Sequence, residues 1–257
     1  MIPKQVLIDL SDNRNKFLLT IFADYGFEVS EFKHKFCEPC LLLLAPTSRI
    51  PLHIPSNSIV FCNKCDDIIE NYLLQKNVKV LKYFDDPILA VQNSNLTAQG
   101  ALAKIIQNTY CGLQELNVLI LGNGKLGFAL LHLLSINQCK VDVLAKRHTD
   151  MYSELLSSRN LYNFGDNLDY FKYNTVINTI PCRVFDDKIK YLNRHCYILD
   201  LSSNPGGVSQ KIATKLGLHL EHYLGVPGKV APKTSAEYTM QSILKRLNAE
   251  NFKTVIN

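Results

Sequence analysis

Apolar residues in the first part of the chain gather in short runs that turns and loops separate. Their length predicts strands at residues 4–10, 28–32, 40–45, 58–61, 78–83 and 88–91. A helical spacing of apolar positions predicts helices at residues 15–25 and 66–75. Strands that alternate with helices favour a small α/β domain of flavodoxin-like type, which we assign to residues 1–94.

The pattern becomes more regular from residue 95 to the C-terminus. Thr97 can cap a helix at 98–110, and a continuous apolar strand follows at 117–121. Further strands are expected at 140–144, 161–164, 175–180, 196–202 and 218–224. Helices are expected at 125–135, 153–159, 186–193, 208–216 and 232–248, with a turn or helix at 166–172. Six strands with helical crossovers predict a doubly wound parallel Rossmann sheet over residues 95–257.

Composition narrows the class of protein. The chain has 257 residues, which fits two modest domains, and is 47% hydrophobic and 20% charged, as in soluble globular proteins. No apolar run approaches the roughly 20 residues that span a membrane, and no secretory signal is visible, so we expect a cytoplasmic protein. The net charge of +5 is spread along the chain, which favours anionic small molecules over nucleic acid. The eight cysteines are expected to be reduced thiols.

A glycine-rich turn follows the strand expected at 117–121. Its sequence, Gly122-Asn-Gly-Lys-Leu-Gly127, leads into an apolar helix and fits the pattern of dinucleotide-binding folds. Gly122 would permit a tight turn, Gly124 the approach of a pyrophosphate, and Gly127 close packing of helix on strand. The helix N-terminus would add N–H donors for the phosphates. We expect the cofactor to contact Gly122, Asn123, Gly124, Lys125, Leu126 and Gly127, the alternative being a Rossmann fold that has lost its cofactor.

The end of the second strand indicates which dinucleotide binds. An NAD site usually has an acid there to hold the ribose 2′-hydroxyl, whereas this strand is followed by Ala145, Lys146 and Arg147. Because two cations suit a 2′-phosphate, we expect Lys146 and Arg147 to bind NADP, with NAD possible. In the alternative interpretation these side chains only cover a solvated edge.

Small and polar residues follow three later strands, at 178–181, 200–207 and 225–234. Ligands of open α/β sheets bind beyond the carboxyl ends of the strands. Pro232 is a common first helical residue, which would place the residues after it at a helix N-terminus. On the cofactor side of the site we expect Thr179, Ile180 and Pro181. On the substrate side we expect Asn204, Gly206, Gly207, Lys229 and Thr234.

Five segments together resemble the motifs of the A-subunit family of dipicolinate synthase. They are Asn95-Leu-Thr-Ala-Gln-Gly100, Leu121-Gly-Asn-Gly-Lys-Leu-Gly127, Ile177-Asn-Thr-Ile-Pro181, Asp200-Leu-Ser-Ser-Asn-Pro-Gly-Gly207 and Gly225-Val-Pro-Gly-Lys-Val-Ala-Pro-Lys-Thr234. The match covers about residues 95–248 in order, and its last three segments are more specific than the glycine turn. Family members usually have Lys at the position of Asn204, Arg at that of Lys125 and an acid at that of Gln99.

The resemblance implies an NADP-dependent oxidoreductase subunit of spore-forming bacteria. With a flavoprotein-like B-subunit, it would oxidise a dihydrodipicolinate-type intermediate, a small dicarboxylate, to pyridine-2,6-dicarboxylate during sporulation. We also expect a homo-oligomer. Lys233, which matches the family motif, is the leading catalytic candidate as a holder of the anionic substrate, beside Lys229 and the amides of Gly206 and Gly207. No general base is identified, because Asp200 can equally be a structural carboxylate.

Two cysteine pairs, Cys37/Cys40 and Cys62/Cys65, have the spacing of a zinc site. If the strands at 40–45 and 58–61 are parallel, the pairs lie at opposite ends of the sheet, far beyond zinc bonding distance. If they are antiparallel, the pairs meet. We expect no metal.

Two other functions are compatible with the sequence. A stand-alone NADP dehydrogenase of shikimate or methylenetetrahydrofolate type shares the two-domain plan, but its paired Lys and Asp are not found in the N-terminal domain. A non-catalytic NADP-binding regulatory subunit would account for the missing general base.

Overall fold

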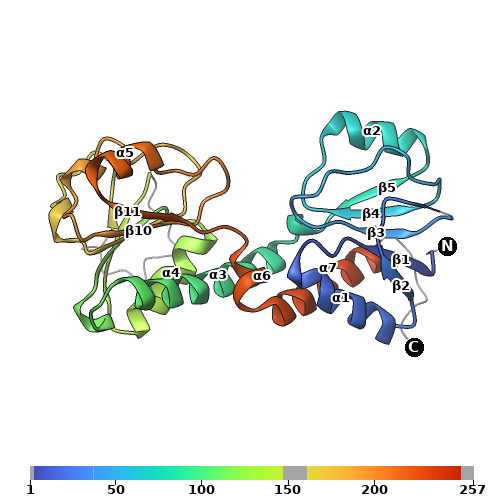
Figure 1. The fold of residues 1–257 in the computed structure, drawn as a ribbon, viewed down its shortest axis with the longest axis horizontal. Coiled ribbons are helices and arrows are strands. Elements are labelled where there is room, and N and C mark those ends of the chain that lie inside the picture. Colours follow the sequence, from blue (N-terminus) through green and yellow to red (C-terminus); the bar gives the residue numbers. More distant parts are fainter. Residues whose placement is uncertain (1–2, 37, 147–160, 250–257) are drawn as a thin grey trace. The chain divides into compact units, whose positions relative to one another are not determined.

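The computed structural model describes residues 3–36, 38–146 and 161–249. It forms two compact units, each with its own parallel sheet and helices (Figure 1). The first unit comprises Met1–Asn93 together with the chain from Pro227 onward, and the second comprises Ser94–Val226.

The first unit is built on a five-stranded sheet in the order β2-β1-β3-β4-β5. All neighbouring strands pair in parallel, which is the flavodoxin-like order that the alternating pattern predicts. The strands are β1 (Gln5–Ile8), β2 (Glu28–Glu31), β3 (Leu41–Leu43), β4 (Ile59–Cys62) and β5 (Lys79–Lys82). The helices are α1 (Asn13–Asp24), α2 (Asp67–Gln75), the 3-10 turn η1 (Tyr83–Asp85) and α7 (Pro232–Ala249).

Helix α7 is part of the first unit, which corrects the domain boundaries expected from the sequence. Its buried residues Ala236, Met240, Ile243 and Leu247 recur every three or four positions and pack in one cluster with Phe22 of α1 and the first sheet. The prediction that the Rossmann domain runs to residue 257 is therefore wrong for this helix. An apolar stripe shows that a helix is buried on one face, but it does not show against which of two sheets.

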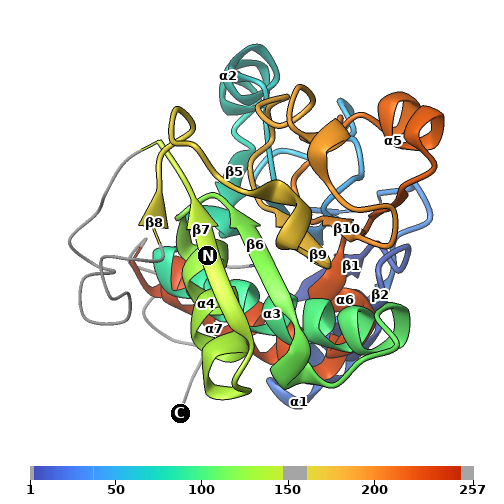
Figure 2. The same cartoon turned by 90° about the vertical axis from the view of Figure 1, so that its left-hand side faces the viewer.

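The second unit is built on a six-stranded parallel sheet in the order β11-β10-β9-β6-β7-β8. This order is that of a Rossmann fold, so the predicted fold class is confirmed (Figure 2). The strands are β6 (Asn117–Leu121), β7 (Lys140–Leu144), β8 (Leu161–Tyr162), β9 (Thr175–Asn178), β10 (Tyr197–Asp200) and β11 (His219–His222). The other elements are α4 (Lys125–Ile136), α5 (Gln210–Leu216) and the 3-10 turns η2 (Leu113–Glu115), η4 (Tyr170–Lys172) and η5 (Ile189–Tyr191).

Three local predictions need correction. The strand expected at 88–91 is the beginning of helix α3 (Pro87–Asn108), because Pro87 starts the helix and the carboxylate of Asp86 accepts a hydrogen bond from the Ile88 amide at 2.9 Å. The helix expected at 186–193 is only the turn η5, and the turn after β11 contains the short helix α6 (Val226–Val230). The helix expected at 153–159 lies outside the described residues.

The parallel pairing of β3 and β4 decides the question of the cysteine pairs. Cys40 precedes β3 and lies opposite the start of β4, whereas Cys62 is the last residue of β4. Four residues of strand separate these two levels, on the order of 13 Å. Cys40 and Cys62 therefore cannot share one metal ion, since zinc–sulfur bonds are ~2.3 Å long. Cys37 lies outside the described residues.

Candidate functional site

The glycine turn of the second unit is held tightly against the end of β9. Gly122 has φ +102°, and a Cβ there would collide with the hydroxyl of Thr179, which donates a hydrogen bond to the Leu121 carbonyl at 2.7 Å. A Cβ on Gly127 would collide with the carbonyl oxygen of Gly122. These two positions accept only glycine, for the geometric reasons that the motif predicts.

Gly124 differs from the other two glycines because, apart from its chain neighbours and its own helix, no described residue has an atom within 4 Å of where its Cβ would be. It is the N-cap residue of α4, so the open space lies at the start of a twelve-residue helix. Unpaired N–H groups and the helix dipole favour an anion at such a position. The chain therefore leaves room for a phosphate group where the motif predicts one.

A cavity of about 520 Å³ opens over this turn, which is a suitable size for a cofactor. It is lined by Gly122, Asn123, Gly124, Lys125, Leu126, Ala145, Lys146, Phe164, Thr179, Ile180, Pro181, Cys182 and Val184. Every described residue that the sequence assigns to the cofactor lines this cavity, except Gly127, which packs beneath the turn. Arg147 lies outside the described residues.

The end of β7 presents a cation to the cavity. Exposed Lys146 lines it, and the residue before it is alanine. The nearest acid of this strand, Asp142, accepts hydrogen bonds from Lys172 and Tyr173, both at 2.7 Å. That carboxylate is part of a structural contact, so the strand offers a dinucleotide ribose a lysine and no carboxylate.

The segments after β9 and β10 are locked to each other around a buried carboxylate. Asp200 is 1% exposed and accepts hydrogen bonds from the Ser202 hydroxyl and amide, the Asn178 side chain, and the amides of Gly207 and Val208, at 2.7–3.1 Å. A Cβ on Gly207 would collide with Ile180 and Asn178. The segments after β9 and β10 therefore fit together only with glycine at position 207, because their backbones are in contact there.

This network corrects one expectation about the substrate. The Gly207 amide donates to Asp200, and the Gly206 amide donates to the Ser203 carbonyl at 3.0 Å, so neither is available to hold an anion. Of the two roles considered for Asp200, general base or structural carboxylate, the contacts favour the structural one, because buried donors occupy both of its oxygens. Asn204 belongs to the same loop, where the bond between it and Pro205 is cis.

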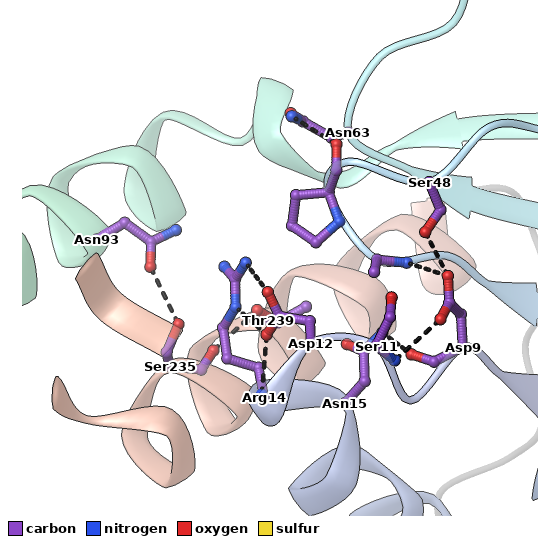
Figure 3. Close-up of polar contacts among 12 residues, drawn as sticks. Asp9, Ser11, Asp12, Arg14, Asn15, Ser48, Asn63, Asn93, Ser235 and Thr239 are labelled. Atoms are coloured by element: carbon purple, nitrogen blue, oxygen red, sulfur yellow. Dashed lines mark hydrogen bonds and ion pairs between the residues drawn. The ribbon is translucent and has the colours of Figure 1, made fainter. Parts of the chain in front are cut away.

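In the first unit, polar side chains gather where β1 and β3 end (Figure 3). Asp9 accepts hydrogen bonds from the Ser11 amide at 3.0 Å, the Ala45 amide at 3.4 Å and the Ser48 hydroxyl. The side-chain amide of Asn15 donates to the backbone carbonyl of Asp9 at 2.7 Å. Asp9 thus ties the loop after β1 to the loop after β3. Burial raises the pKa of Asp9, but these hydrogen bonds outweigh it and the pKa is lowered.

A buried ion pair lies beside these loops. Asp12 caps α1 and binds the Arg14 guanidinium at 2.9 and 2.8 Å; the side chain of Arg14 is only 8% exposed. A Cβ on Gly228 would lie 3.2 Å from both partners, so the α6 backbone rests directly on the pair. Burial raises the pKa of Asp12, but the hydrogen bonds and charge of Arg14 outweigh it and hold the pKa below its usual value.

Lys229, Lys233 and Thr234 belong to this first unit, and not to the Rossmann unit where the sequence led us to expect them. Lys233 is exposed in the first turn of α7 and makes no ion pair with another described residue. Two residues further on, buried Ser235 donates a hydrogen bond to the Asn93 side chain at 3.3 Å (Figure 3). The proposed substrate residues are therefore divided between the two units.

Comparison with known proteins identifies a relative. No family model matches the chain. The A-subunit of dipicolinate synthase from Bacillus subtilis (strain 168) is 29% identical over 203 residues, which cover 76% of this chain and 66% of the relative, just under two thirds of its length. The resemblance predicted from the motifs is confirmed.

Solved structures agree on the fold. The dipicolinate synthase A-subunit from Bacillus halodurans has a TM-score of 0.80 at 21% identity, covering 96% of this chain and 99% of that one. D-lactate dehydrogenase from Escherichia coli has a TM-score of 0.61 at 10% identity, covering 98% and 99%. The chain thus has the two-unit fold that these two proteins share. Within the described residues, no helix is both long and apolar enough to cross a membrane.

Three polar residues with defined contacts in the structure were not identified from the sequence. Asp9 directly follows β1, a position that could have revealed it. Arg14 is the second residue of α1 and has the polar neighbours Asn13, Asn15 and Lys16, which are typical of an exposed first turn. His222 lies inside the strand expected at 218–224, whereas the structure makes it the last residue of β11.

Proposed function

We propose that the chain is an oxidoreductase of the dipicolinate synthase A-subunit type, with a nicotinamide dinucleotide bound over the glycine turn. The observation that carries this proposal is the open space beside Gly124, at the N-terminus of α4 and inside a cavity of about 520 Å³. Because the described residues leave room for a pyrophosphate beside Gly124, they fit the cofactor. The cofactor would supply the hydride-accepting ring.

NADP is the dinucleotide that the charges favour. Lys146 lines the cavity at the end of β7, and Asp142 is already bound by Lys172 and Tyr173. A 2′-phosphate gains a charge-assisted contact with the lysine, whereas the described residues at this strand end offer the 2′-hydroxyl of NAD no carboxylate. Arg147, the next residue in the sequence, adds a second cation to this proposal.

The substrate we propose is a dihydrodipicolinate-type dicarboxylate, which is oxidised to pyridine-2,6-dicarboxylate. The name of the curated relative and the shared motifs support this reaction. Oxidation removes a hydride and a proton and leaves an aromatic ring, so the protein has mainly to bind and orient a dianion. Lys233 is the proposed holder of a substrate carboxylate, with Lys229 and Thr234 beside it in the sequence and Asn204 on the second unit.

The biological setting follows from the same resemblance. We propose a cytoplasmic enzyme of sporulation that works with a flavoprotein-like B-subunit, and that also forms a homo-oligomer. Turnover that appears only after mixing with this partner supports the arrangement. Turnover by the chain alone favours instead a stand-alone dehydrogenase, and cofactor binding without turnover in either format favours a regulatory role.

The test of the proposed cofactor is a titration of the purified chain with NADPH and NADH. We expect tighter binding of NADPH, and we expect Lys146→Glu to reverse the preference by roughly tenfold or more, because the substitution replaces an attraction by a repulsion. Lys140→Glu, at the opposite end of β7, is the matched control and should leave both affinities unchanged. The preference for NADP would be refuted if the parent chain bound NADPH and NADH with equal affinity and Lys146→Glu did the same.

A further inference from the structure

His222 is the last residue of β11, and its register partner on β10 is Asp200. Asp200 is in turn paired with Asn178, the last residue of β9. The histidine therefore lies at the carboxyl edge of the Rossmann sheet, where ligands of such sheets bind. The strands β9, β10 and β11 lie on one side of β6, which carries the glycine turn, whereas β7 and Lys146 lie on its other side. In the proposed function, the nicotinamide and the substrate would lie over the β9–β11 side of the sheet.

One nitrogen of the His222 ring is fixed by the backbone. Nε2 lies 2.7 Å from the carbonyl oxygen of Ser202. A carbonyl oxygen can only accept a hydrogen bond, so Nε2 must carry a proton. In the neutral ring the lone pair is therefore on Nδ1, and none of the described residues makes a hydrogen bond with that nitrogen. The backbone thus selects the tautomer in which Nδ1 can accept a proton.

The loop around the ring is built to hold it in place. Gly206 has φ +87°, and a Cβ there would lie 3.3 Å from Cε1 and 3.6 Å from Nδ1 of His222. The same Cβ would lie 3.0 Å from a carboxylate oxygen of Asp200. The ring thus packs against a bare backbone, in a loop that is fixed to Asp200 through the Gly207 and Val208 amides.

The other titratable groups near this strand end do not serve as a base. Asp200 has both oxygens occupied by buried donors. Glu221, the residue before His222 in β11, binds Lys104 and the Tyr197 hydroxyl, both at 2.8 Å. Tyr223 follows on the same chain, and Lys104 lies 4.9 Å from the centre of its ring. Among the described groups of these elements, His222 alone combines a fixed ring with an available lone pair.

We infer that His222 is the proton acceptor of the oxidation, an inference that rests on the proposed function. A bound oxidised nicotinamide would accept, as hydride, the electron pair and hydrogen of one C–H bond of the dihydropyridine ring. A second ring-bound hydrogen leaves as a proton, which forms a new bond to Nδ1 of His222. The electron pair that this hydrogen leaves behind completes the aromatic ring. The imidazolium then releases its proton to water.

The variant that tests this role is His222→Gln, measured in the enzyme assembled with its partner. The glutamine amide can still donate to the Ser202 carbonyl, but it cannot accept a proton. We expect kcat/KM to fall by about 10²–10⁴, the usual contribution of a general base. In the parent enzyme we expect activity to fall toward low pH, because an Nδ1 that already carries a proton cannot accept another. In His222→Gln the residual activity should not show this fall. His219→Gln, on the exposed start of the same strand, is the matched control and should leave both unchanged.

A second readout does not depend on turnover. Nitrogen NMR of the full chain with labelled histidine should show the Nε2–H tautomer for the signal that His222→Gln removes. An Nδ1–H tautomer would overturn the inference, and so would an unchanged rate or an unchanged pH profile in His222→Gln. Binding of NADPH by the parent chain tests the proposed function separately. If NADPH does not bind, the proposed function fails, whereas NADPH binding with a fully active His222→Gln enzyme refutes only the role of this residue.

Discussion

Several glycines in this chain lie in contacts that leave no space for a side chain. Gly122, Gly127 and Gly207 each lie where a Cβ would meet neighbouring atoms. The first two follow from the spacing of the glycine motif, so the sequence could predict them. The packing of Gly207 on Asn178 and Ile180 joins two strands that are distant in the sequence, and no local pattern indicates it.

The Asp12–Arg14 pair is the residue-scale feature with the clearest energetic consequence. Replacing Arg14 by methionine leaves the Asp12 carboxylate partly buried without its cation, although the apolar stem of the side chain is kept. We expect Arg14→Met to lower the free energy of unfolding by about 3–5 kcal/mol, as in other broken buried pairs. Urea denaturation measures the change.

Lys33→Met is the matched control for this prediction. Lys33 pairs with Glu31 at 3.7 Å, and its side chain is 77% exposed. An exposed pair of this kind contributes about 0–1 kcal/mol, so the control should be close to neutral. Equal effects of the two substitutions would show that the Arg14 pair does not stabilise the fold.

At the scale of elements, hydrophobic periodicity located nearly all strands and most helices, and the failures have identifiable causes. The run at 88–91 is apolar and short enough for a strand, yet Asp86 and Pro87 start a helix there. When a segment is assigned as helix or strand, an N-cap residue followed by proline should count for more than a run of four apolar residues. The helix expected at 186–193 shortens to η5, whose only buried residue is Ile189.

Helix α7 shows a second limit of local patterns. Its apolar stripe correctly predicted a buried helix, but the covered partner is the first sheet and α1. Which sheet a terminal helix joins depends on contacts over more than 200 residues of sequence. For the same reason, the sequence grouped Lys233 with the Rossmann strand ends, whereas the structure places it in the first unit.

At the scale of the whole molecule, carboxylates with lowered pKa values are present in both units. Burial raises the pKa of Glu221, but hydrogen bonds from Lys104 and Tyr197 outweigh it, as Arg14 does for Asp12 and Ser48 for Asp9. These groups lose a proton more readily in the folded protein than in the unfolded chain. Their contribution to stability is therefore complete above the unfolded values of 3.8 for Asp and 4.5 for Glu.

This linkage predicts acid sensitivity. As the pH falls below about 4.5 and through the lowered folded pKa values, the stabilisation is lost, because the unfolded chain then binds more protons. Urea midpoints between pH 7 and pH 3 should decrease in this window, and Arg14→Met should show a shallower decrease. A midpoint that stays constant or rises toward pH 3 would contradict the assignment of these carboxylates.

We propose that the space beside Gly124 receives the pyrophosphate of a nicotinamide dinucleotide. Gly124→Val tests this directly, because no described residue beyond its chain neighbours and its own helix has an atom within 4 Å of the new Cβ, and the backbone φ of −76° suits any residue. Gly112→Val, before β6, is the control, since its Cβ meets only the Glu115 side chain at 3.6 Å. Calorimetric titration with NADPH should show binding by the parent chain and by Gly112→Val, and a loss of at least a hundredfold in Gly124→Val with its thermal stability kept. NADPH binding that is absent from the parent chain, or unchanged in Gly124→Val, would contradict the account.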